Sequence, residues 1–158
     1  MVMRRTLGTT LLLLTVLAGC GDESAPDADE RPGTTASPCV DSAGDCYEPP
    51  VLVSGTAGGG EVATEGTELA DHDDVAAYVA QFDDAFAADV TEAAASVQVP
   101  QGSTLVAAVV SVGCDVPPGA DVERVAGDIE ITAQEVPSPM KECFAPVTTV
   151  ALAAVPAA

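Results

Sequence analysis

The chain has 158 residues and a formal net charge of −20 at pH 7, from 25 acidic and 5 basic side chains. This length fits one small domain and leaves little room for a second. The charge argues against nucleic acid as a partner, because phosphate binding depends on Lys and Arg. The sequence has no Trp, two Tyr and three Phe, so a stacking surface for bases or sugars is also hard to build.

The first twenty residues have the pattern of an export signal. Arg4 and Arg5 form a positive start, and Leu11–Leu14 belongs to the apolar stretch that follows. That stretch is shorter than the ~20 residues that a membrane-spanning helix needs. It ends in Leu17-Ala18-Gly19-Cys20, which resembles the lipobox of bacterial lipoproteins. The alternative is an ordinary signal peptide with an incidental Cys.

The resemblance implies a lipoprotein signal peptide over residues 1–19, cleavage before Cys20, and a diacylglycerol group on the thiol of Cys20. Acyl chains such as palmitate contribute about 0.8 kcal/mol per buried CH₂ group, so two of them hold a protein stably on a membrane. The expected location is the extracytoplasmic face of the cell membrane. Beyond the lipobox, the composition is similar to that of small Ala-, Val- and Asp-rich lipoproteins of high-GC Gram-positive bacteria.

Residues 20–38 are predicted to be the lipidated Cys20 followed by a disordered acidic tether. The segment Gly21–Pro38 has five acidic residues, three prolines and no large apolar side chain. Such a segment buries too little apolar surface to offset the conformational entropy of ordering it. Residues 39–158 then remain as a single small domain, with its core over about residues 51–155.

Four cysteines remain once Cys20 carries lipid. An even number in an exported chain predicts two disulfides, and four cysteines allow three connectivities. We favour Cys39–Cys46, which closes a short loop with turn-forming residues, and Cys114–Cys143, which would join the end of one strand to the start of another. A zinc site is the rival interpretation, but the sequence has no C-x-x-C spacing.

The first half of the domain predicts a short strand, a loop and a helix. Val51–Val53 is apolar and β-branched at two of its positions, whereas Gly55–Gly66 is glycine-rich and polar and predicts a flexible loop. Asp71 or Asp73 can cap a helix. Apolar residues then recur at helical spacing at Val75, Tyr78, Val79, Phe82 and Phe86. This pattern predicts one amphipathic helix whose apolar side rests on a sheet.

The second half of the domain has strand-like patterns, after an ambiguous segment at Thr91–Val99. Thr104–Val112 is apolar on both faces, as expected of a central strand. Asp121–Val125 is a weaker strand, and Asp128–Gln134 alternates between apolar and polar residues. Val147–Val155 is a closing strand. We therefore predict an α+β fold, with a small antiparallel sheet of about four to five strands and one amphipathic helix packed on it.

The single histidine, His72, lies between Asp71 and Asp73. It fits either a metal ligand or acid–base group, or a solvated helix start at which aspartates complement the helix dipole. We favour the helix start, because one His cannot make a zinc site alone. We therefore predict no metal site, no cofactor and no catalytic residue, and so no enzyme. A cleft joining His72 to a Ser or a carboxylate would favour an enzyme instead.

The sequence supports two binding hypotheses. The first is a lipid-anchored, non-enzymatic cell-envelope protein that contacts the membrane through Cys20 and another envelope protein through its acidic domain. The second is a carrier that holds an apolar ligand between helix and sheet. The many alanines in Thr104–Val112 and Val147–Val155 leave room for a ligand, or simply allow close packing.

Overall fold

The computed structural model of the chain describes residues 47–157. The predictions of a signal peptide, of lipidation at Cys20, of a tether and of a Cys39–Cys46 disulfide therefore concern residues outside the described ones. The described elements, in chain order, are β1 (Val51–Thr56), β2 (Ala63–Glu68), α1 (His72–Val79), α2 (Asp84–Ser96), β3 (Ser103–Gly113), β4 (Ala120–Val125), β5 (Asp128–Ala133) and β6 (Val147–Pro156). Within these residues neither helix is long and apolar enough to cross a membrane.

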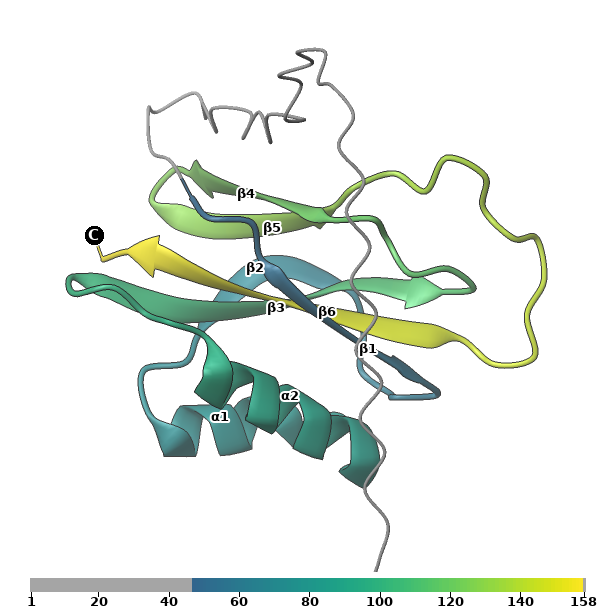
Figure 1. Ribbon diagram of the computed structural model, residues 1–158, viewed down its shortest axis with the longest axis horizontal. Coiled ribbons are helices and arrows are strands. Elements are labelled where there is room, and N and C mark those ends of the chain that lie inside the picture. The colour runs from purple at the N-terminus through teal and green to yellow at the C-terminus, as the bar shows by residue number, and fades with distance from the viewer. Residues whose placement is uncertain (1–46, 158) are drawn as a thin grey trace, which may run out of the picture. The chain divides into compact units, whose positions relative to one another are not determined.

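The strands form one curled antiparallel sheet in the order β1-β6-β3-β2-β5-β4. Figure 1 shows α1 and α2 packed beneath the face formed by β1, β6 and β3, while the β4–β5 hairpin lies over the opposite face. The sheet thus curls into half a barrel, and its central strands are covered on both sides. Such double coverage explains why these strands contain so few polar residues.

The predicted fold class is wrong. The sequence indicated a sheet of about four to five strands with one helix, whereas the structure is mostly sheet, with six strands in a curled half-barrel and two short helices. The curl arises because β5 and β4 continue the sheet past β2 and turn back over β3 and β6. Strand pattern alone does not reveal such a curl, since the same alternation serves flat and curled sheets.

The expected central strand is confirmed in β3, where residues 105–110 are all buried. Alternate residues of this strand belong to two separate apolar clusters. Val106 and Val110 pack beneath the hairpin with Ile131, while Leu105 and Val109 pack against the helices with Phe86. β6 pairs with β3 along most of its length and contributes to both clusters in the same way.

The alternation predicted for Asp128–Gln134 is confirmed in β5. Ile129 and Ile131 are buried, and the residues between and beside them are exposed. The preceding turn places Ala126 at φ 54° and Gly127 at φ 108°. Positive φ at both central residues is the geometry of a tight two-residue hairpin, and it joins β4 to β5 with matching twist.

The helical segment is divided into two helices and not one. Asp71 caps α1, where its side chain accepts hydrogen bonds from the backbone N–H groups of Asp73 and Asp74. Asp83 caps α2 in the same manner, accepting from the N–H groups of Ala85 and Phe86. A second capping residue after a continuous apolar stripe therefore starts a new helix and lets the chain change direction.

The glycine-rich segment is not a flexible loop throughout. Its end belongs to β2, a strand that the sequence analysis did not predict because its residues are polar and mostly exposed. Within the segment, Gly58 accepts a hydrogen bond from the N–H group of Asp83 (3.0 Å), and the carbonyl of Gly59 accepts one from Thr148 Oγ1 (2.7 Å). These bonds hold the segment between the helices and the start of β6.

Candidate functional site

A cleft of about 640 Å³ opens where the helices meet the beginning of β3. Four separate parts of the chain line it. They are the stretch from the end of β2 into the start of α1, the second half of α2 with Val99 beyond it, the start of β3, and Ala157 after β6. The volume of the cleft lies within the range of ~300–1,000 Å³ that is usual for small-molecule sites. The cleft is therefore the candidate functional site.

The inner wall of the cleft is apolar. Leu69, Ala94 and Leu105 line it and are otherwise buried in the core between the helices and the sheet. The backbone N–H group of Leu69 donates to the carbonyl of Leu105 (2.8 Å), which holds the turn after β2 against β3. Val75 of α1 also lines the cleft and is partly buried.

The rim of the cleft is polar. Glu68, Asp71 and His72 line it, and all three are exposed to solvent. Thr104 Oγ1 donates to Glu68 Oε1 (2.8 Å), so the Glu68 carboxylate is held beside the start of β3. Asp71 is the N-cap of α1, and its Oδ1 atom accepts from two backbone N–H groups at 2.8 and 3.1 Å. An apolar wall beneath a carboxylate rim can hold a small molecule by its apolar part and orient its polar part.

A second hollow of about 390 Å³ shares Glu68 and Thr104 with the cleft and extends towards the β4–β5 turn. Arg124 lines this hollow and donates to the carbonyls of Gly127 (3.2 Å) and Pro156 (2.7 Å). Its guanidinium group thereby ties the hairpin to the end of β6. Among residues 47–157, no ion pair joins Arg124 to Glu68 within 4.0 Å.

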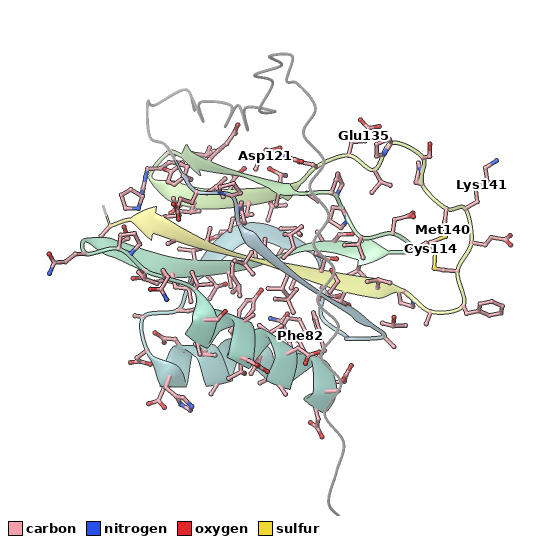
Figure 2. The ribbon with its side chains drawn as sticks, in the orientation of Figure 1. Phe82, Cys114, Asp121, Glu135, Met140 and Lys141 are labelled. Carbon is pink, nitrogen blue, oxygen red and sulfur yellow. A yellow bond between two sulfur atoms is a disulfide. The ribbon has the colours of Figure 1, made fainter. Side chains whose placement is uncertain are left out.

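The structure places Cys114 and Cys143 in a disulfide, one of the two that we favoured from the sequence. Cys114 follows β3, and Cys143 lies in the long segment between β5 and β6. Figure 2 shows Cys114 beside Met140, with Lys141 farther out on the same segment. The N–H group of Met140 donates to Asp115 Oδ2 (2.8 Å), which adds a second attachment. Met140 and Phe144 are nevertheless exposed.

His72 is the first residue of α1, as the helix-start interpretation requires, but it also lines the cleft. The cleft therefore brings His72 together with Ser103 and carboxylates, which is the arrangement that would favour an enzyme. Within the described residues, no hydrogen bond joins His72 to Ser103. A nucleophile and its general base normally lie within such a bond, although it is often longer before substrate binds. The described residues contain no group of three or more side chains that could hold a metal ion.

No motif in the sequence marks the cleft. Glu68 and Ser103 carry no motif, and Thr91 and Ala94 look like ordinary helix residues. Only the packing of the helices against β3 brings these segments together. The nearest signal was the alanine content of Thr104–Val112, but its alanines are buried in the two cores and do not line the cleft.

No protein-family profile matches the sequence, and neither a curated protein nor a solved structure matches it.

Proposed function

We propose that this chain is a lipid-anchored, non-enzymatic binding protein of the cell envelope that holds a small, largely apolar ligand in the cleft. The single observation that supports ligand binding is the cleft itself, with a volume of about 640 Å³ and an apolar wall between the helices and β3. The resemblance of Leu17-Ala18-Gly19-Cys20 to a lipobox supports the anchor.

The anchor is tested by intact mass spectrometry of the membrane-extracted protein. We expect a mature chain that begins at Cys20 and carries diacylglycerol, and we expect Cys20→Ser to remove the mass of the diacylglycerol group. A mature chain without diacylglycerol would contradict the anchor. Alkylation of the same sample counts free thiols, and two disulfides leave none in the mature chain.

Ligand binding is tested with the fluorescent apolar probe N-phenyl-1-naphthylamine. Ala95 lies on α2 and lines the cleft, so Ala95→Phe places a ring where the ligand would lie. Ala88 is exposed on the same helix two turns earlier and does not line the cleft, so Ala88→Phe is a matched control. The chains are compared as mature residues 20–158 with Cys20→Ser, so that no lipid binds the probe. We expect probe fluorescence to rise with this chain and with its Ala88→Phe variant, and to be lost with its Ala95→Phe variant. Equal fluorescence in all three chains would contradict the proposal.

An ester-hydrolysis assay tests whether the cleft is an active site and not only a binding site. His72 and Ser103 line the cleft, so an esterase would cleave a nitrophenyl ester of a short fatty acid there. We expect no hydrolysis above the background of a Ser103→Ala chain. Hydrolysis that Ser103→Ala and His72→Ala each abolish would replace the proposed binding function with a catalytic one.

A second candidate function is contact with another envelope protein at the segment between β5 and β6. The exposure of Phe144 and Met140 beside the Cys114–Cys143 disulfide favours it, because a constrained segment loses little entropy on binding. Crosslinking in intact cells tests it. We expect a Phe144→Ser chain to lose a crosslinked partner that the wild type retains, whereas unchanged crosslinking would contradict this function.

A further inference from the structure

The titratable side chains that line the cleft are Glu68, Asp71 and His72, and the two carboxylates have different surroundings. The Asp71 side chain accepts hydrogen bonds from two backbone N–H groups at the start of α1, where the helix dipole also favours a negative charge. Glu68 accepts a bond from one neutral hydroxyl, that of Thr104. The charge of Glu68 is therefore the less compensated of the two.

Within residues 47–157, no cationic side chain forms an ion pair with Glu68. Arg124 lines the adjacent hollow, but its guanidinium group donates to two backbone carbonyls. His72 lines the same cleft and forms no ion pair with Glu68. The net charge of −20 also gives the whole chain a field that attracts cations and repels anions.

The apolar wall begins directly beside Glu68. Leu69 is its neighbour in the chain, and Leu105 follows Thr104, the residue that holds the Glu68 carboxylate. Both leucines are buried, at 5% and 7% exposure, and Ala94 of α2 also lines the cleft. A ligand with a charged end at Glu68 would therefore lay its apolar part along this wall.

From this arrangement, and resting on the proposed ligand cleft, we propose that the ligand is a small cationic amphiphile. Its ammonium group binds the Glu68 carboxylate, and its apolar part contacts Leu69, Leu105 and Ala94. Charge complementarity selects this class over a fatty acid, whose carboxylate would face Glu68 and Asp71. A charge-assisted hydrogen bond at a partly exposed site changes affinity by about tenfold.

The test uses three ligands with the same eight-carbon chain, namely octylammonium, octanol and octanoate. Each one displaces N-phenyl-1-naphthylamine from the predicted mature chain, residues 20–158, with Cys20→Ser, which lacks both the lipid and the apolar signal segment that would themselves bind amphiphiles. We expect octylammonium to displace the probe at about tenfold lower concentration than octanol, and we expect octanoate to be the weakest competitor. Glu68→Gln is expected to bring octylammonium to the level of octanol, because the amide keeps the bond with Thr104 without the charge.

Glu65→Gln is the matched control, since Glu65 is exposed on the same strand and does not line the cleft. It removes the same charge and is expected to leave the preference for octylammonium unchanged. Equal displacement by the three ligands, or the same loss of preference in both variants, would overturn this inference while leaving the ligand cleft in place. If the probe fails to bind in the cleft at all, the proposed function itself is wrong.

Discussion

Close contact between glycines and an aromatic ring joins β1 to the helices. The ring of Phe86 lies between Gly55 and Gly58, and a Cβ atom added to either glycine would lie 2.9 Å from Cγ of that ring and closer still to a Cδ atom. Phe86 is buried and stacks edge to face on Phe82, at a centroid distance of 5.1 Å. The ring of Phe86 therefore packs directly on the backbone of Gly55 and Gly58, where a larger residue would clash with it.

We expect Gly58→Ala to lower the free energy of unfolding by about 1–3 kcal/mol, because the new methyl group overpacks the core against Phe86. Gly113→Ala is the control, since a Cβ atom at Gly113 meets nothing within 4 Å. That control should change stability by no more than about 1 kcal/mol. Urea unfolding followed by circular dichroism measures both, and equal effects would contradict this account of Phe86.

Tyr78 is a buried aromatic residue with an unsatisfied hydroxyl group. Its side chain is 8% exposed, and its hydroxyl oxygen has no hydrogen-bond partner within the described residues. Its ring packs edge to face on Phe82 at 5.7 Å. Burial raises the pKa of the Tyr78 phenol well above its usual range, because the phenolate would lose its hydration.

We expect Tyr78→Phe to stabilise the protein by about 1–2 kcal/mol at pH 7, because it removes a desolvated hydroxyl and keeps the ring. The pKa direction adds a second expectation. Above pH ~10 the unfolded tyrosine loses its proton while the folded one keeps it, so wild-type stability falls as pH rises. Unfolding measured between pH 8 and 11 should show a smaller fall for Tyr78→Phe. A destabilised variant with the same pH slope as the wild type would contradict both points.

At the scale of the elements, three glutamates form a row across β2, β5 and β4. Glu65 is paired with Glu130, and Glu130 is paired with Glu123 on its other side. All three are exposed. Directly paired residues of antiparallel strands project from the same face, about 4.5–5.5 Å apart, so these like charges repel one another.

We expect Glu130→Gln to stabilise the protein by about 0.5–1 kcal/mol at low salt, because it removes both repulsive pairs at once. The gain should shrink at 1 M salt, where the Debye length is about 3 Å. Glu61→Gln is the control, since Glu61 is exposed just before β2 and belongs to no pair. Thermal unfolding at two salt concentrations measures the difference. Equal gains for both variants would assign the effect to net charge alone.

At the scale of the whole domain, long-range attachments hold the curled sheet. The Cys114–Cys143 disulfide joins positions 29 residues apart, with a Cα–Cα distance of 5.4 Å, and ties the segment before β6 to the end of β3. At the other end of β6, Arg124 binds the carbonyl of Pro156 and the turn of the β4–β5 hairpin. The disulfide therefore links the segments on either side of the hairpin near the start of β6, and Arg124 links the hairpin to the end of β6.

We expect the double variant Cys114→Ser, Cys143→Ser to lose about 3–4 kcal/mol of stability, because the disulfide closes a loop of 29 residues in the unfolded chain. Glu142→Ser, in the same segment, should leave stability nearly unchanged, since its side chain is exposed. Guanidinium unfolding of the oxidised wild type and both variants provides the measurement. A loss below about 1 kcal/mol in the double variant would show that the sheet holds its curl without the bond.

Local sequence patterns predicted the position of most strands but not their assembly. The alternation around Ile129 and Ile131 and the unbroken apolar run of β3 are period-two signals, and both were confirmed. β2 escaped prediction because an exposed polar strand has no apolar alternation, and Gly66 in its middle looks like a loop residue. In the structure Gly66 lets β2 approach Val106 and the carbonyl of Ile129.

Single residues and their near neighbours by themselves predicted a helix cap at Asp71 or Asp73 and the faces of β3 and β5, because such features depend on interactions within a few positions. The structure then selected Asp71 as the cap. The lipobox at Leu17-Ala18-Gly19-Cys20 is a local signal of the same kind, and the anchor it predicts stays a prediction. Tertiary structure alone decided the curl of the sheet, the division of the helical segment and the cleft beside Glu68. The cleft exists only because four distant segments pack together, and no short stretch of sequence encodes where another segment will lie.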